Sequence, residues 1–211
     1  MANHVFSYIE FYAEEHEKQD DLCKHIESLL TEDIKNKSYD AIHHVLEAFG
    51  HPEVTEEQQT RSWYTDTIGA KWCHAEDFSE ATIATNSAWS APIDFARLCC
   101  ELLSKDFPGI YATVEFEDEM PNFIGSALVT AEEIDDVEEI EYSEIVEAVK
   151  EKTGRSEVDD DEFGELLWDD DVLREEWYEY ISRWKSDSST SQAQAHVEWI
   201  QEMKENNEVD V

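Results

Sequence analysis

Basic residues are scarce in this sequence of 211 residues. It contains 15 Lys and Arg against 53 Asp and Glu, which gives a formal net charge of -38. A protein that binds nucleic acid directly needs Lys and Arg to displace the counterions of the phosphates. Anionic membrane surfaces attract basic segments for the same reason. The shortage of basic residues therefore excludes nucleic acid and anionic membranes as direct partners.

Long apolar runs and disulfide patterns are also missing. No stretch of about 18 apolar residues occurs, so the sequence predicts no membrane-spanning helix. Residues 1–15 lack the basic region and the apolar run of a signal peptide. The 4 cysteines, Cys23, Cys73, Cys99 and Cys100, fit no disulfide framework. We therefore expect reduced thiols and a cytoplasmic protein.

Aromatic residues, by contrast, are plentiful. Apolar residues make up 41% of the chain, and they include 7 Trp, 8 Tyr and 9 Phe. This is too much apolar material for an acidic disordered chain, so we expect a packed core that forms against strong self-repulsion. Lys outnumbers Arg by 10 to 5 and Gly is rare at 6, which argues against adaptation to high salt as the cause of the acidity.

The charge divides the chain into two parts. Residues 1–130 carry 25 acidic and 8 basic residues and all 4 prolines, whereas residues 131–211 carry 28 acidic and 7 basic residues. The second part is therefore the more acidic for its length. We expect a first domain over residues 1–130 and an acidic helical domain over residues 131–211.

The apolar patterns of the first part alternate between strands and helices. Expected strands cover 5–12, 72–78, 81–88, 110–116 and 122–129, and expected helices cover 14–31, 39–49 and 92–107. This order predicts an α+β fold with a ferredoxin-like antiparallel sheet and helices on one face. In the second part, expected helices cover 142–152, 163–184 and 193–203, and a polar break at 186–191 separates the last two.

Short motifs between residues 69 and 129 resemble those of one known family. They are Gly69 with Lys71-Trp72, Ala88-Trp89-Ser90-Ala91-Pro92, Asp106-Phe107-Pro108, Val114-Glu115-Phe116-Glu117 and Phe123-Ile124-Gly125. Together with the opening Met1-Ala2-Asn3-His4-Val5, they resemble the YubB-like ferredoxin-like family of plasmid and phage proteins, over about the first 130 residues. Ile93 stands in place of the family's second proline, and Ala70 in place of its usual threonine.

This resemblance implies a ferredoxin-like fold, an origin in a mobile element and hence the cytoplasm of a bacterial host cell. It implies no catalytic residue. Residues 131–211 lie outside the resemblance, so their structure and function must be predicted from their own sequence pattern.

Signatures of a metal site or of catalysis are not found. The 8 histidines and 4 cysteines show no CxxC, HxxxH or HExxH spacing. A calcium-loop pattern from Asp159 has Phe163 at the fifth position, where an oxygen ligand belongs. No GxSxG motif, Gly-rich phosphate loop or Cys/His signature occurs. We therefore expect no metal, no cofactor and no enzyme activity.

The remaining feature is a set of acidic runs in the second part. Carboxylates at helix positions i, i+3 and i+4 stand about 5–6 Å apart, and duplex DNA carries one charge per about 1.7 Å of axis. Aromatic residues such as Trp168, Trp177 and Tyr178 interleave with the acids and are expected to anchor them in a core. The candidate partner-binding residues are Glu132, Glu133, Asp135, Asp136, Glu138, Glu139, Asp159, Asp160, Asp161, Glu162, Asp169, Asp170, Asp171, Glu175 and Glu176.

These observations favour a phage- or plasmid-encoded DNA mimic. It would inhibit a host defence protein, such as a nuclease, by occupying its basic nucleic-acid-binding surface. Two alternatives stay open. In the first, the sheet recognises a protein through an edge strand and the acidic helices only keep the chain soluble. In the second, the chain is a small metal-dependent enzyme whose ligands are scattered along the sequence.

Overall fold

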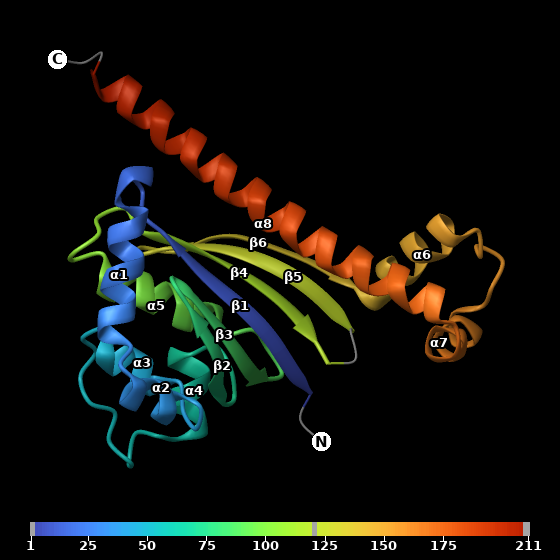
Figure 1. Cartoon of the computed structure of the whole chain (residues 1–211), viewed down its shortest axis with the longest axis horizontal. Coiled ribbons are helices and arrows are strands. Elements are labelled where there is room, and N and C mark those ends of the chain that lie inside the picture. Colours follow the sequence, from blue (N-terminus) through green and yellow to red (C-terminus); the bar gives the residue numbers. More distant parts are fainter. Residues whose placement is uncertain (1–2, 120–121, 209–211) are drawn as a thin grey trace.

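The computed structural model describes residues 3–119 and 122–208, with side chains at all of them except 161, 207 and 208 (Figure 1). A six-stranded sheet has the order β2-β3-β1-β4-β5-β6, and all neighbouring strands are antiparallel. The strands are β1 (His4–Tyr12), β2 (Cys73–Ser79), β3 (Thr82–Ala88), β4 (Tyr111–Asp118), β5 (Phe123–Thr130) and β6 (Ile134–Glu141). β1 to β4 have the ferredoxin-like order. The predicted α+β fold class is confirmed.

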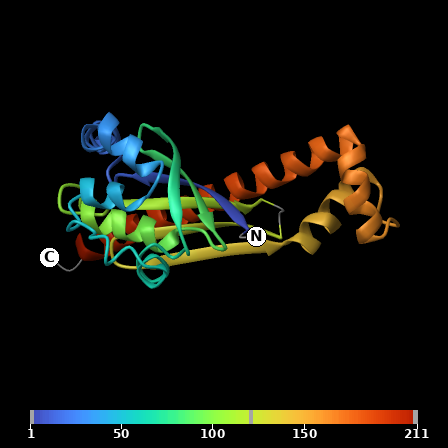
Figure 2. The ribbon, with the colours of Figure 1, turned by 90° about the horizontal axis from the view of Figure 1, so that it is seen from below.

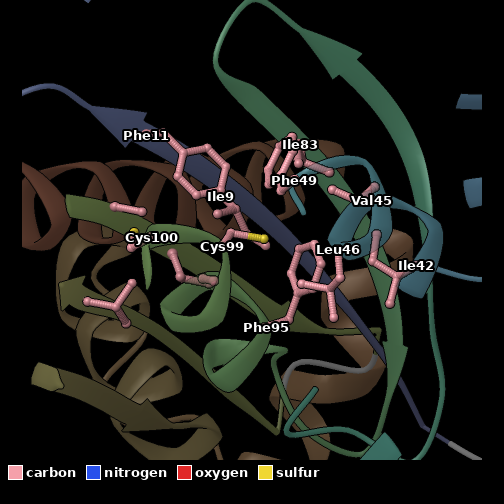
Figure 3. Packing of buried hydrophobic residues seen from close by; sticks show 14 of the residues in the cluster. Ile9, Phe11, Ile42, Val45, Leu46, Phe49, Ile83, Phe95, Cys99 and Cys100 are labelled. Atoms are coloured by element: carbon pink, nitrogen blue, oxygen red, sulfur yellow. The ribbon is translucent and has the colours of Figure 1, made fainter. Parts of the chain in front are cut away.

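Helices of the first part cover one face of this sheet. They are the short 3-10 helix η1 (His16–Lys18), α1 (Gln19–Leu29), α2 (Glu32–Ser38), α3 (His43–Ala48), α4 (Arg61–Thr67) and α5 (Ile93–Leu103). Because strand side chains alternate, β1 turns Val5, Ile9 and Phe11 toward α1, α3 and α5. The resulting first hydrophobic cluster includes Phe95 and Cys99 (Figure 3). The four cysteines are free thiols.

The second part of the chain contributes three helices, α6 (Tyr142–Thr153), α7 (Asp160–Asp169) and α8 (Asp171–Glu208). α6, α7 and the start of α8 project past one end of the sheet (Figures 1 and 2). A second hydrophobic cluster holds them together, with Val149, Phe163 and Trp177 buried and Ile124 of β5 included. The 38 residues of α8 span about 57 Å and run back over the sheet, on the face opposite α5.

Three expectations for the second part are wrong. Residues 134–141 form a strand rather than part of a helical domain, and Ile140 of β6 lies opposite Ile124 of β5. The expected helix over 163–184 is interrupted at Asp170, whose Oδ1 accepts the backbone N–H groups of Val172 and Leu173 at 3.0 and 3.1 Å and so begins α8. The expected polar break at 186–191 lies inside α8.

The expected domain boundary falls between β5 and β6. The first hydrophobic cluster contains no residue beyond Ala131, whereas the second begins at Ile124. Two cores therefore exist, although one sheet passes across the boundary. That residues 1–130 fold independently stays a prediction. Among the described residues, no helix is both long and apolar enough to cross a membrane.

Candidate functional site

The acids of β6 that face α8 hold this helix on the sheet. Glu138 accepts a hydrogen bond from the Ser188 hydroxyl, and Asp136 accepts one from the side-chain amide of Gln192 at 3.2 Å. Asp135 lies near the same helix, with its Oδ2 3.6 Å from Nδ1 of His196. These three carboxylates therefore have a structural role inside the molecule, in addition to any role at its surface.

Three other predicted acids near β6 remain open to a partner. Glu132, Glu133 and Glu139 are exposed and, within the described part of the chain, make no salt bridge. Glu139 lies opposite Gly125 and so occupies the face of the sheet away from Asp136 and Glu138. Partial loss of hydration, followed by repulsion from Glu141, raises the pKa of Glu139. A cation beside this carboxylate would relieve that repulsion.

The predicted acids of α7 and α8, with Asp170 between the two helices, fall into a paired and an unpaired group. The pairs are Asp160 with Lys150, Asp170 with Arg155, Asp171 with Arg174 and Glu176 with Lys152. The hydrogen bond from Arg155 is the main reason that the pKa of Asp170 is lowered. The pairs of Lys150 and Lys152 join α6 to α7 and to α8, whereas Asp171 and Arg174 pair within α8. Part of the predicted array is therefore already neutralised.

The unpaired group is smaller. Glu162, Asp169 and Glu175 are exposed and take part in no salt bridge among the described residues. Asp159 is exposed but does not belong to this unpaired group, and the side chain of Asp161 lies outside the described part. The predicted set therefore includes exposed carboxylates without a salt bridge among the described residues, but part of its charge is already neutralised inside the molecule.

A pocket lies beside this surface, where the end of the sheet meets α7 and α8. Its volume is about 540 Å³, and its walls include Phe6 of β1, Trp168 of α7 and Tyr178 of α8. Trp168 and Tyr178 are 64% and 55% exposed, so the expectation that they belong to the core is wrong. Trp177 is buried as expected and closes the base of the pocket.

Carboxylates complete the pocket. Asp118, at the end of β4, is only 2% exposed, and its Oδ2 accepts hydrogen bonds from the side-chain amides of Asn3 and Asn122. Its Oδ1 has no hydrogen-bond partner among the described residues. Glu117, on the opposite face of β4, pairs with Lys185 at 2.5 Å. A buried carboxylate with an unsatisfied oxygen is costly, and its cost falls if a cation enters the pocket.

This pocket does not follow from local sequence patterns, because its walls come from β1, β4, α6, α7 and α8. Phe6 is about 160 residues from Trp168 in the chain, and only the fold brings them together. The fold also brings together a group of possible metal ligands that the sequence patterns did not predict. In the described residues, His43, His44 and Glu47 place one ligand atom each within 4.8 Å of one another. Their spacing, His-His-x-x-Glu, matches none of the patterns CxxC, HxxxH and HExxH.

Fold and site together define an acidic α+β protein with a ferredoxin-like sheet, a polar helix across one face and an aromatic pocket beside an acidic surface. Comparisons with protein-family models, with curated proteins and with solved structures find no match. The resemblance to the YubB-like family therefore stays a prediction.

Proposed function

We propose that this chain is an acidic mimic of nucleic acid, encoded by a phage or plasmid, that blocks the basic nucleic-acid-binding surface of a host defence protein. One observation carries the proposal: exposed carboxylates are mounted on elements that two buried clusters hold in place. Glu139 is fixed by the pairing of β6, and Asp169 and Glu175 are fixed where α7 meets α8. A disordered acidic tail would lose conformational freedom on binding, whereas a folded array does not.

The spacing of these elements suits the proposed role. Side chains on one face of an antiparallel strand repeat every two residues, at about 6.8 Å, which is twice the axial spacing of about 3.4 Å between phosphates of one DNA strand. Acids at i and i+3 or i+4 on α8 add a second row at about 5–6 Å. Arg and Lys side chains that normally bind phosphates would form charge-assisted hydrogen bonds with these carboxylates.

The aromatic pocket supports the same proposal. Arg side chains stack on aromatic rings and pair with carboxylates, and the pocket is lined by both kinds of group, including Trp168, Tyr178 and Asp118. An Arg of the partner inserted there would be largely desolvated, as the energetically dominant contacts of protein interfaces usually are. The surrounding charge would speed association at low salt by attracting a basic surface from a distance.

A pull-down from a bacterial lysate tests the proposal directly. The full chain is immobilised, and captured proteins are eluted either with duplex DNA or with an equal mass of a neutral polymer. We expect basic nucleic-acid-binding proteins that DNA releases and the neutral polymer does not. Raising the salt concentration should release the same proteins, because screening weakens ion pairs at a surface. Capture of a partner that excess DNA leaves in place would contradict mimicry.

A second function is favoured by one feature of the sheet. β6 is an edge strand with Ile134 and Val137 38% and 48% exposed, so its outer backbone groups could pair with a strand of another protein. The acids of β6 would then protect this edge from unspecific pairing. Such a partner would resist DNA in the pull-down, and a proline at Val137 would abolish its binding.

A further inference from the structure

We propose that His43, His44 and Glu47 bind a divalent transition-metal ion, with zinc as the best match to their chemistry. All three lie on α3, and the ligand atoms that they offer lie within 4.8 Å of one another. His43 and Glu47 stand four residues apart and so share one side of the helix. The proposal does not depend on nucleic-acid mimicry, because α3 packs on the face of the sheet opposite α8.

His43 supplies the observation that points to a ligand. Its side chain is buried, with 2% of the residue exposed, and Nδ1 is hydrogen-bonded to the hydroxyl of Tyr64 at 3.0 Å. Nε2 is also buried and has no hydrogen-bond partner among the described residues. Buried polar atoms in folded proteins nearly always have a partner, so this nitrogen needs an explanation. A metal ion at Nε2 supplies the missing partner.

Hydrogen bonds from Tyr64 and Val54, outside α3, orient two of these side chains, and one further contact lies within α3. The hydroxyl of Tyr64 on α4 fixes the His43 ring through Nδ1. The backbone N–H of Val54 donates to Oε1 of Glu47 at 2.7 Å, and Oε2 lies 3.0 Å from Nδ1 of His44. Partners of this kind are typical of metal sites, where they set the ring orientation and the basicity of each ligand.

The ligand set discriminates between classes of ion. Two imidazoles and one carboxylate suit zinc, with a fourth position left for water, whereas magnesium and calcium prefer oxygen ligands. This preference separates the site from the acidic surface, which attracts any divalent cation. All three ligands belong to α3, and the hydrogen bond from Val54 to Glu47 links the site to the segment that leads to α4.

A zinc titration against a chromophoric chelator tests the proposal on the full chain, in excess magnesium that occupies the surface carboxylates. We expect one zinc ion per chain to remain bound and the melting temperature to rise. His44→Ala and Glu47→Gln, both at half-buried positions, should weaken zinc binding at least tenfold. The matched controls His16→Ala and Glu53→Gln change exposed residues and should leave the affinity within twofold.

Two outcomes would overturn the site. One is displacement of zinc by magnesium, and the other is equal affinity in the His44 and Glu47 variants and in their controls. Cobalt added to the unmodified chain gives an independent measurement if a variant fails to fold. A four-coordinate site with nitrogen ligands produces strong visible absorption, whereas cobalt on surface carboxylates stays nearly colourless, and the latter result would also reject the proposal.

Discussion

The two faces of the sheet are built from the same strands but by different interactions. On β4, Val114 and Phe116 face α5 and are buried in the first hydrophobic cluster, whereas Glu115 and Glu117 face α8. The first face is held by removal of apolar surface from water, at about 1.5–3 kcal/mol for each large side chain. The second is held by hydrogen bonds to carboxylates, at about 1.5–3 kcal/mol each.

This difference shows how a chain with a net charge of -38 tolerates carboxylates on the face of the sheet that α8 crosses. Ser189 donates to Glu115 at 2.6 Å, Ser188 donates to Glu138, and buried Lys185 pairs with Glu117. Each carboxylate under α8 therefore has a donor that offsets its lost hydration. The apolar face depends on packing, and the polar face depends on donors that must match in position.

Removing a large side chain from the apolar face should have the largest effect on stability. Phe95→Ala deletes a fully buried ring of the first cluster, and we expect a loss of about 3–5 kcal/mol in the free energy of unfolding. Urea denaturation followed by circular dichroism measures it. Tyr39→Ala, at a residue 43% exposed, is the control and should cost much less. Equal losses would show that the ring of Phe95 is not packed as described.

Removing a donor from the polar face should cost less. Lys185→Met deletes the partner of Glu117 while keeping an unbranched apolar chain, and we expect a loss of about 1–3 kcal/mol. Glu117→Gln in the same chain should restore part of it, because the carboxylate is then no longer unpaired. Lys105→Met, at an exposed residue, is the control for loss of a positive charge. If both lysine variants behave alike, general charge explains the effect and the pairing does not.

The comparison of faces also explains what sequence could predict. The apolar residues Val5, Ile9 and Phe11 alternate with other residues because one side of the strand packs on an apolar core. Such alternation can be seen in the sequence, so the strands of the apolar face could be predicted. β6 carries apolar residues at intervals of three, Ile134, Val137 and Ile140, and this spacing resembles a helix more than a strand. Its true partner is a row of hydroxyl and amide groups on α8, which leaves no apolar signal.

The polar run at 186–191 was misinterpreted for the same reason. Serines usually mark a loop, but Ser188 and Ser189 are buried in α8 because carboxylates of the sheet accept their hydrogen bonds. The two candidate sites depend on contacts between residues that lie even further apart in the chain. His43 is held by Tyr64 from another helix, and the aromatic pocket joins β1 to α7 and α8, so neither arrangement follows from local spacing.

Neutralising the open carboxylates should weaken binding of the partner recovered by pull-down. Replacing six exposed acids that make no salt bridge among the described residues removes charge while preserving shape, and losing two genuine contacts lowers affinity at least tenfold, or about 1.4 kcal/mol. Isothermal titration calorimetry measures this affinity. The changed residues are Glu132, Glu133, Glu139, Glu162, Asp169 and Glu175, each replaced by its amide.

A matched control has the same change in charge on the first part of the chain. It replaces the exposed residues Glu17, Asp20, Glu27, Glu53, Glu56 and Glu57 by their amides. We expect it to lower affinity less than threefold. Equal losses from both sets would mean general attraction between an acidic and a basic protein, and no loss from the first set would remove these acids as the mimic surface.

Salt should stabilise the fold modestly. The Debye length falls from about 30 Å at 0.01 M to about 8 Å at 0.15 M, which screens repulsion among the exposed carboxylates. We expect a rise of about 2–4 °C in melting temperature for each kcal/mol of relieved repulsion, measured by differential scanning calorimetry. The control with six amides in the first part should respond less steeply. A melting temperature that stays constant or falls with salt would contradict this account.

The smallest expected effect is a change in how the stability of the polar face depends on pH. His196 is buried on the side of α8 that packs against the sheet, and this burial lowers its pKa, although the nearby carboxylate of Asp135 partly opposes the shift. The unfolded chain then binds a proton more readily than the folded one, so this contribution to stability is complete above about pH 6.5 and is lost as pH falls through the folded pKa. We therefore expect His196→Gln to lose less stability than the unmodified chain between pH 7.5 and pH 5.5, measured by urea denaturation. His16→Gln, at an exposed residue, should follow the unmodified chain. Repulsion among carboxylates also weakens on acidification, so only the difference between the variants is informative. Identical pH profiles for all three proteins would show that the packing of α8 on the sheet does not keep His196 from water.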